Sequence, residues 1–168
     1  MAKPKPAVSA AVRRRSMARL AVVQALYQME IAQTDLNQVV AEFSAGNMGR
    51  IVGEDQGVDL VEPDADFFRN LIFGVVQNQK DIDPAINKAL AKGWKLDRLD
   101  ATLRAILRAG AYELKHRTDV PMKVAITEYL DIARAFFDGP EPKVVNGVLD
   151  ALARKWGREE TELHGQAK

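Results

Sequence analysis

The chain of 168 residues contains no cysteine, which excludes disulfide scaffolds and thiolate metal sites. It also lacks long apolar runs, because the longest extend over only a few residues, whereas about 20 are needed to span a bilayer. No short apolar core of a secretory signal follows the basic N-terminus. These absences predict a soluble protein that is not exported, and a cytoplasmic location agrees with them.

Acidic residues are missing from the start of the chain: none precedes Glu30, although six Lys and Arg lie in that stretch. The rest carries 18 Lys and Arg against 23 Asp and Glu. The formal net charge of +1 is therefore the sum of a basic N-terminal segment and a mildly acidic remainder. Four arginines cluster there, Arg13, Arg14, Arg15 and Arg19. Arginine holds phosphate oxygens in pairs and stacks on bases, which favours nucleic acid as a partner. A solvated N-terminal arm is the alternative.

The apolar residues recur at helical spacing, and no segment has a convincing strand pattern. The sequence therefore predicts an all-α fold of about seven helices. They are expected over 16–33, 36–43, a segment that begins near Asp64, a segment from the Asp83–Pro84 start signal to Gly93, 99–114, 123–137 and 145–156. Gly74 lies inside the third of these helices, which predicts close approach of another helix.

The domain limits follow from the same pattern. Residues 1–12 are predicted to form a flexible basic arm, 13–157 a helical domain and 158–168 a flexible tail. The run Arg13–Arg15 either extends the first helix by a turn or precedes it as part of the arm. The glycine-spaced stretch 44–62 is predicted to be a mobile connection.

Candidates for catalysis are few. His116 lies at a predicted helix end, where the helix dipole explains it, and His164 lies in the tail. The carboxylate pairs Asp81 with Asp83 and Glu159 with Glu160 suit capping and solvation. We therefore predict no catalytic, cofactor or metal site, and favour a binding protein over an enzyme.

The choice of nucleic acid depends on Tyr27. It lies two turns beyond Arg19, so a base stacked on its ring could have its phosphate held by the arginines. Alternatively, Tyr27 is a core residue of the first helix. Because no short helix-turn-helix with a basic second helix is present, single-stranded RNA suits the pattern better than duplex DNA.

Five strings occur in one order along most of the chain: ARLAVVQALYQ at 18–28, FFRNLIFGVVQN at 67–78, ILRAGAYEL at 106–114, DVPMKVAITE at 119–128 and VVNGVLD at 144–150. Together they resemble the NusB family of bacterial transcription antitermination factors. The resemblance implies seven helices in two subdomains and a non-enzymatic role in ribosomal RNA transcription. It also implies binding to boxA RNA as a heterodimer with the ribosomal protein NusE, within the Nus complex on RNA polymerase.

The resemblance implies site residues as well. The family's arginine-rich motif corresponds to Arg13, Arg14, Arg15 and Arg19. Tyr27 could face RNA or NusE, and Lys143 could meet a phosphate. Asn146 and Gly147 are expected to provide a local hydrogen bond and a close helix crossing. Some family members dimerise by hiding their arginines, which raises a homodimer of the free protein. The alternative function is a helical protein-interaction adaptor without sequence-specific RNA binding.

Overall fold

The computed structural model describes residues 9–44 and 62–158. These ranges contain six α-helices, one short 3-10 helix and no strand, which confirms the all-α class. In chain order the elements are α1 (Ala10–Ile31), α2 (Leu36–Ser44), α3 (Ala65–Ala89), η2 (Leu96–Arg98), α4 (Ala101–His116), α5 (Met122–Phe136) and α6 (Glu141–Lys155).

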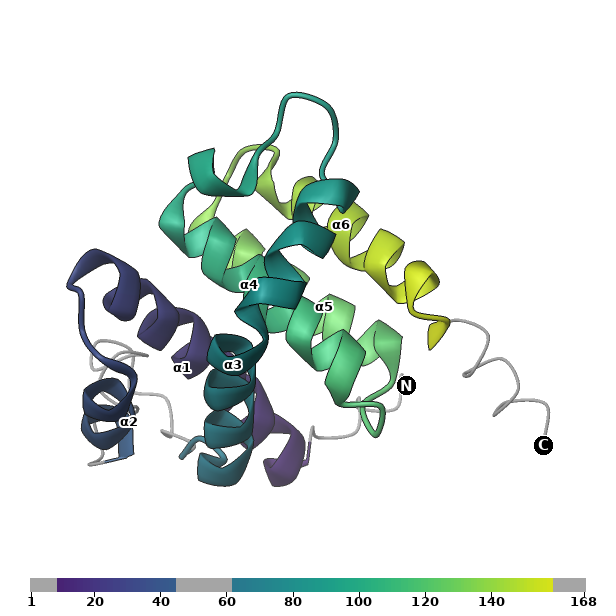
Figure 1. The fold of residues 1–168 in the computed structure, drawn as a ribbon. Coiled ribbons are helices and arrows are strands. Elements are labelled where there is room, and N and C mark those ends of the chain that lie inside the picture. Colours follow the sequence, from purple (N-terminus) through teal and green to yellow (C-terminus); the bar gives the residue numbers. More distant parts are fainter. Residues whose placement is uncertain (1–8, 45–61, 159–168) are drawn as a thin grey trace, which may run out of the picture.

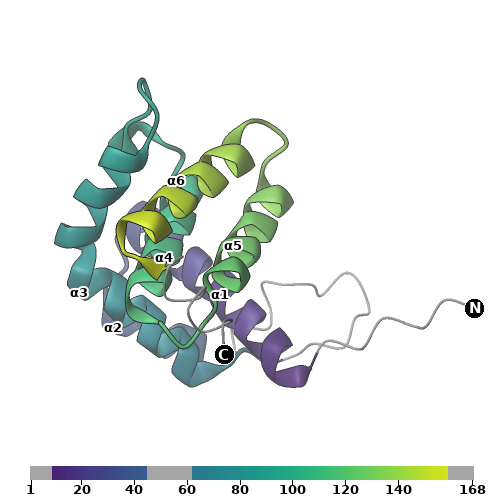
Figure 2. The ribbon, with the colours of Figure 1, turned by 90° about the vertical axis from the view of Figure 1, so that its right-hand side faces the viewer.

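Helix α4 lies at the centre of the molecule (Figure 1). Eleven of its sixteen residues are buried, as expected for a helix covered on several sides. It packs against α1 and α3 on one side and against α5 and α6 on the other. Figure 2 shows α4 and α6 between α3 and α5. The helices thus form an N-terminal group, α1–α3, and a C-terminal group, α4–α6, which share one hydrophobic core.

Helix α1 begins earlier than the apolar pattern predicts. The Ser9 side chain accepts a hydrogen bond from the backbone N–H of Val12 at 3.2 Å and so caps the helix, which fixes its start at Ala10. The basic run Arg13–Arg15 is therefore helical, which confirms the alternative that it extends the first helix. The predicted arm is too long by three residues, because residues 10–12 belong to α1, and residues 1–8 lie outside the described ranges.

The predicted start of a separate helix at Asp83–Pro84 is wrong, because α3 continues through Pro84 to Ala89. A proline inside a helix removes one backbone hydrogen bond and crowds the preceding turn. Burial of Ile82 and Ile86 on both sides of Pro84 favours continuation nevertheless. The Asp83 carboxylate, expected as an N-cap, instead accepts two hydrogen bonds from Arg108 of α4, each 2.9 Å.

Two glycines of the core let helices approach closely. A Cβ atom at Gly74 of α3 would overlap the ring of Tyr112 on α4, so the close approach predicted there is confirmed. Gly110 of α4 similarly admits Leu149 of α6, since a Cβ atom would lie 2.9 Å from a Leu149 methyl carbon. By contrast, Gly147 is exposed with nothing within 4 Å of its Cβ position. The helix crossing expected at Gly147 is therefore wrong.

The folded region also extends to the last described residue. Arg158, predicted to open the flexible tail, is 5% exposed. Its guanidinium donates hydrogen bonds to the backbone carbonyls of Leu114 and Val120, each 2.6 Å. These bonds fasten the residue after α6 to the last turns of α4 and to the turn between α4 and α5. The remainder of the predicted tail, 159–168, lies outside the described ranges.

Candidate nucleic-acid interface

The first turns of α1 carry three arginines that solvent reaches. Arg13 and Arg14 are exposed, and the Arg15 side chain is 38% exposed. Arg14 Nε donates to the backbone carbonyl of Glu62 at 3.3 Å, and Arg15 Nη1 lies 3.8 Å from the Asp119 carboxylate. We call Arg13, Arg14 and Arg15 the basic end of α1. Three guanidiniums on neighbouring positions of one helix can contact successive phosphates of a strand.

The fourth arginine of the predicted motif is in a different environment. Arg19 is 2% exposed, and its guanidinium donates to both oxygens of the Glu113 carboxylate, at 2.8 and 2.7 Å. Tyr129 also donates to Glu113, at 2.8 Å. Arg19 has almost no exposed surface, so its guanidinium, predicted to contact RNA phosphate, is held inside the protein in this structure.

The electrostatics of this buried cluster agree with a stable ion pair. Burial by itself lowers the pKa of Arg19, but the hydrogen bond and negative charge of Glu113 outweigh burial and raise the pKa above its usual value. Burial and the Glu113 charge raise the pKa of Tyr129 well above its usual value, so its hydroxyl stays a donor. The cluster therefore combines a charged pair with a neutral phenol.

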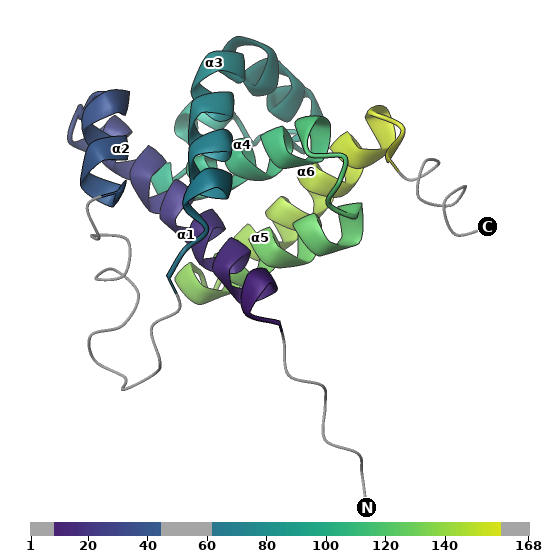
Figure 3. The same ribbon diagram turned by 90° about the horizontal axis from the view of Figure 1, so that it is seen from below.

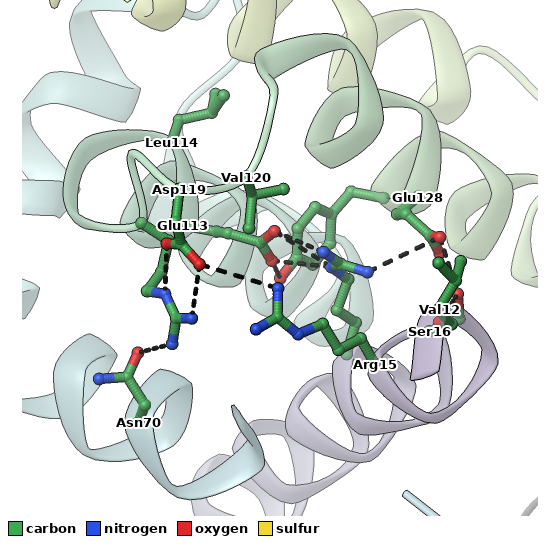
Figure 4. A network of polar contacts seen from close by, with 12 residues as sticks. Val12, Arg15, Ser16, Asn70, Glu113, Leu114, Asp119, Val120 and Glu128 are labelled. Carbon is green, nitrogen blue, oxygen red and sulfur yellow. Dashed lines mark hydrogen bonds and ion pairs between the residues drawn. The ribbon is translucent and has the colours of Figure 1, made fainter. Parts of the chain in front are cut away.

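The same cluster fixes the direction of α1. Arg19 Nη1 lies 3.7 Å from Glu128 of α5, and Ser16 donates to Glu128 at 2.7 Å. Figure 4 shows these contacts from α1 meeting the carboxylates of α4 and α5, and Figure 3 shows α5 beside the N-terminal half of α1. Burying Arg19 thus holds the helix whose outer face presents the basic end.

A second, more exposed cluster lies beside the basic end. Arg117, just after α4, donates to both Asp119 carboxylate oxygens at 2.9 Å, and to the Asn70 side chain at 3.1 Å. The guanidinium carbons of Arg15 and Arg117 lie 4.7 and 4.9 Å from the centroid of the Phe67 ring, within cation–π range. Its hydrogen bond to Asp119 raises the pKa of Arg117, and the same bond lowers the pKa of Asp119.

Tyr27 occupies an aromatic groove near the other end of α1. The tyrosine is 42% exposed, so the alternative that it is a core residue is wrong. Twelve residues separate it from Arg15, a distance of about 18 Å along a helix. The groove has a volume of about 570 Å³ and is lined by α1, α2, α5 and the start of α4, through Val23, Gln24, Tyr27, Gln28, Ile31, Ala32, Phe43, Asp100, Thr102 and Phe136.

Lys143 is exposed and lines a second hollow, of about 530 Å³, where α5 meets α6. Arg134 and Asn146 share this hollow, so a cation and hydrogen-bonding groups face the same space. Phe137 lines it too, whereas its neighbour Phe136 lines the aromatic groove. The end of α5 therefore separates the two hollows, and Lys143 is not part of the basic end.

Sequence reasoning missed two features of this surface. Phe136 is 47% exposed, and a signal for it exists: with Phe137 on the apolar stripe of 126–137, the adjacent Phe136 has to point elsewhere. Arg15 and Arg117 meet at Phe67 and Asp119 although they come from segments far apart in the chain. No pattern in the local sequence predicts such a contact.

The described residues offer little for catalysis. His116 ends α4, its ring stacks on Tyr112 with centroids 4.7 Å apart, and burial together with Lys115 lowers its pKa. Within 9–44 and 62–158, no three His, Asp or Glu residues are grouped as metal ligands. No helix in these ranges is long and apolar enough to cross a membrane.

Comparison with known proteins gives one family. The model of the NusB family matches residues 16–154. The chain is 49% identical to the transcription antitermination protein NusB of Rhodopseudomonas palustris (strain HaA2), over 94% of this chain and 92% of that protein. The solved structure of T. maritima NusB is similar at a TM-score of 0.67 and 32% identity, covering 95% of this chain and 97% of that one.

A further similar fold occurs in the crystal structure of antitermination factors NusB and NusE in complex with double-stranded RNA. The TM-score is 0.67 at 22% identity, covering 85% of this chain and 98% of that one. At this identity the likeness concerns the fold.

Proposed function

The chain belongs to the NusB family, and on this premise we propose that it is a transcription antitermination factor that binds boxA-type single-stranded RNA together with NusE. In this proposal the pair supports ribosomal RNA transcription as part of the Nus complex on RNA polymerase. The observation that carries the proposal is the layout of α1, which presents three accessible arginines at one end and an exposed tyrosine in an aromatic groove at the other.

The basic end suits phosphates. Arginine forks bind phosphate oxygens in pairs, and each neutralised phosphate releases counterions, which gives affinity that falls with salt. Arg13, Arg14 and Arg15 supply up to three such contacts. Arg19 acts indirectly, because its buried pair with Glu113 holds the helix that presents them.

The aromatic groove suits unstacked bases. Tyr27 and Phe136 expose 42% and 47% of their surface beside Asp100 and Thr102, so a ring face and polar groups are available together. Single-stranded RNA can splay a base into such a place, while a paired base cannot reach it. The separation of about 18 Å between Arg15 and Tyr27 requires a short strand instead of a lone nucleotide.

The partner proposals rest on the relatives. A similar fold is found in a complex of NusB, NusE and RNA, and the groove is apolar enough to contact either protein or RNA. We therefore propose that NusE binds beside the RNA on the same side of the molecule, and that free protein could form a homodimer that covers the basic end.

The test is a titration of boxA RNA and a scrambled strand at several salt concentrations, with and without NusE. We expect tighter binding to boxA RNA, and tighter still with NusE. Replacing Arg13, Arg14 and Arg15 by alanine should reduce affinity by about 100-fold, at roughly 1 kcal/mol for each exposed contact. It should also flatten the salt slope by about two units, since each single-strand phosphate contributes about 0.7.

The matched control removes three exposed lysines from the last turn of α3 and the turn that follows it: Lys88, Lys92 and Lys95. This end of α3 and the turn after it lie at the opposite end of the molecule from the start of α1 (Figure 1). Equal losses in the two triple variants would mean that only overall charge matters. RNA-independent binding of NusE, with no preference for boxA, would favour the adaptor alternative.

A further inference from the structure

Arg15 of the basic end and Arg117 next to it both contact the carboxylate of Asp119. Arg117 holds Asp119 with both prongs of its fork at 2.9 Å, and Arg15 reaches the same carboxylate from α1 at 3.8 Å. Figure 4 shows the contact that joins Asp119 to Arg15, and Arg117 also donates to Asn70 at 3.1 Å. One anionic group thus bridges α1 and the turn before α5.

This arrangement is the one that a phosphodiester would use. Carboxylate and phosphate both present two oxygens to a guanidinium fork, so a place built for one accepts the other. The carboxylate is accessible from solvent, because the Asp119 side chain is 53% exposed, while those of Arg15 and Arg117 are 38% and 20% exposed. The buried pair of Arg19 and Glu113, at 2% and 0%, offers no such entry.

Groups other than the carboxylate also contact the two arginines. Both lie against the ring of Phe67, which is itself 2% exposed. Arg117 also donates to Asn70 at 3.1 Å. A phosphate that replaced Asp119 would therefore meet groups already oriented, with little ordering left to do.

We propose that Asp119 is an internal competitor for RNA phosphate, and that Arg117 is a phosphate-binding residue that acts with Arg15. When RNA binds, a phosphodiester takes the place of the Asp119 carboxylate between the two guanidiniums, and the carboxylate turns to solvent. This inference rests on the proposed function. It adds Arg117, outside the arginine run of α1, as a phosphate-binding residue. It also makes the Asp119 carboxylate a group that lowers the affinity for RNA.

Exchange of one anion for another has a measurable consequence. In the wild-type protein the phosphate replaces the Asp119 carboxylate, which already neutralises the two arginines. This contact therefore adds almost nothing to the slope of log affinity against log salt concentration. In the Asp119→Asn protein the same phosphate neutralises unpaired arginines. The slope should then steepen by about 0.7 for this one contact.

The test compares boxA RNA affinity of the wild-type, Asp119→Asn and Asp150→Asn proteins. Asp150 is the matched control, because it pairs with Arg154 at 3.0 Å on α6 and its replacement changes the net charge equally. We expect Asp119→Asn to tighten binding about three- to fivefold, the size of one exposed ion pair. Asp150→Asn should leave affinity nearly unchanged.

A second set of variants separates local exchange from general charge. Arg117→Gln should weaken binding about threefold to fivefold while the circular dichroism stays helical. In a protein that already carries Arg15→Gln and Arg117→Gln, Asp119→Asn should no longer tighten binding. Persistence of the full gain in that background would overturn the inference.

The outcomes distinguish the two proposals. Equal affinities of the Asp119→Asn and Asp150→Asn proteins, with boxA preference intact, would overturn this inference alone. A wild-type protein that does not distinguish boxA from scrambled RNA would overturn the proposed function, and the inference with it.

Discussion

Two arginine clusters lie within one helical turn of each other on α1, and they differ mainly in their access to water. Arg19 and Glu113 are 2% and 0% exposed, whereas Arg15 and Asp119 are 38% and 53% exposed. Both clusters contact the ring of Phe67. The comparison shows that burial, and not residue type, decides whether an arginine holds the fold or remains available to a ligand.

The difference has an energetic side. A buried charge that loses its partner stays desolvated, which costs about 3–5 kcal/mol. An exposed pair is replaced by water at a cost of about 0–1 kcal/mol. The inner cluster can therefore fix α1 against α4 and α5, while the outer cluster can exchange its carboxylate without harm to the fold.

The largest expected effect comes from breaking the inner pair. Replacing Arg19 by methionine leaves Glu113 buried without its cation, so the free energy of unfolding should fall by about 3–5 kcal/mol. Replacing Arg15 by methionine should cost less than about 1 kcal/mol. Urea unfolding followed by circular dichroism measures both, and equal losses would contradict the assignment of Arg19 as the structural arginine.

A smaller effect should follow when each cluster loses one neutral side chain that hydrogen-bonds to a charged group. Tyr129→Phe removes the buried donor to Glu113 and should cost about 1–2 kcal/mol. Asn70→Ala removes the exposed acceptor of Arg117 and should cost less than about 0.5 kcal/mol. The same unfolding experiment gives both numbers. A larger loss for Asn70→Ala would reverse the order of the two clusters.

The smallest effect concerns pH. The pKa of Asp119 is lowered by Arg117 in the folded state, so its ion pair stabilises the protein above the unfolded pKa of about 3.9 and this contribution disappears as pH falls through the folded value. Since the group is exposed, the gain is at most about 0.5–1 kcal/mol. The stability difference between wild type and Asp119→Asn should be constant from pH 7 to 5 and vanish in stronger acid.

Much of the fold could be predicted from the sequence, because long helices can be recognised from the regular spacing of their apolar residues. The exceptions have local causes. The start of α1 depends on the Ser9 cap, which precedes a stretch without apolar period. The unity of α3 depends on burial around Pro84, which overrides the local signal of a helix start.

The site was less predictable than the fold, because the apolar spacing in α1 does not show correctly which of its residues face the core. The spacing of Leu20, Val23, Tyr27 and Ile31 predicts that these four residues form the inward stripe, and Val23 is buried, but Tyr27 and Ile31 are exposed. The buried face of α1 consists mostly of alanine and valine, with Leu26 and Arg19 in addition: Ala18, Arg19, Ala21, Val22, Val23, Ala25 and Leu26. A buried arginine needs an acid from elsewhere, and Glu113 lies 94 positions away in the chain.

The most direct test of the account observes the arginines themselves. Side-chain Nε–Hε signals of Arg13, Arg14, Arg15 and Arg19 can be followed by NMR while boxA RNA is added to the wild-type protein. The account predicts shifts for the three residues of the basic end and an unchanged signal for Arg19, protected by Glu113 in free and bound protein. A shift of Arg19 with unchanged signals from the basic end would contradict it.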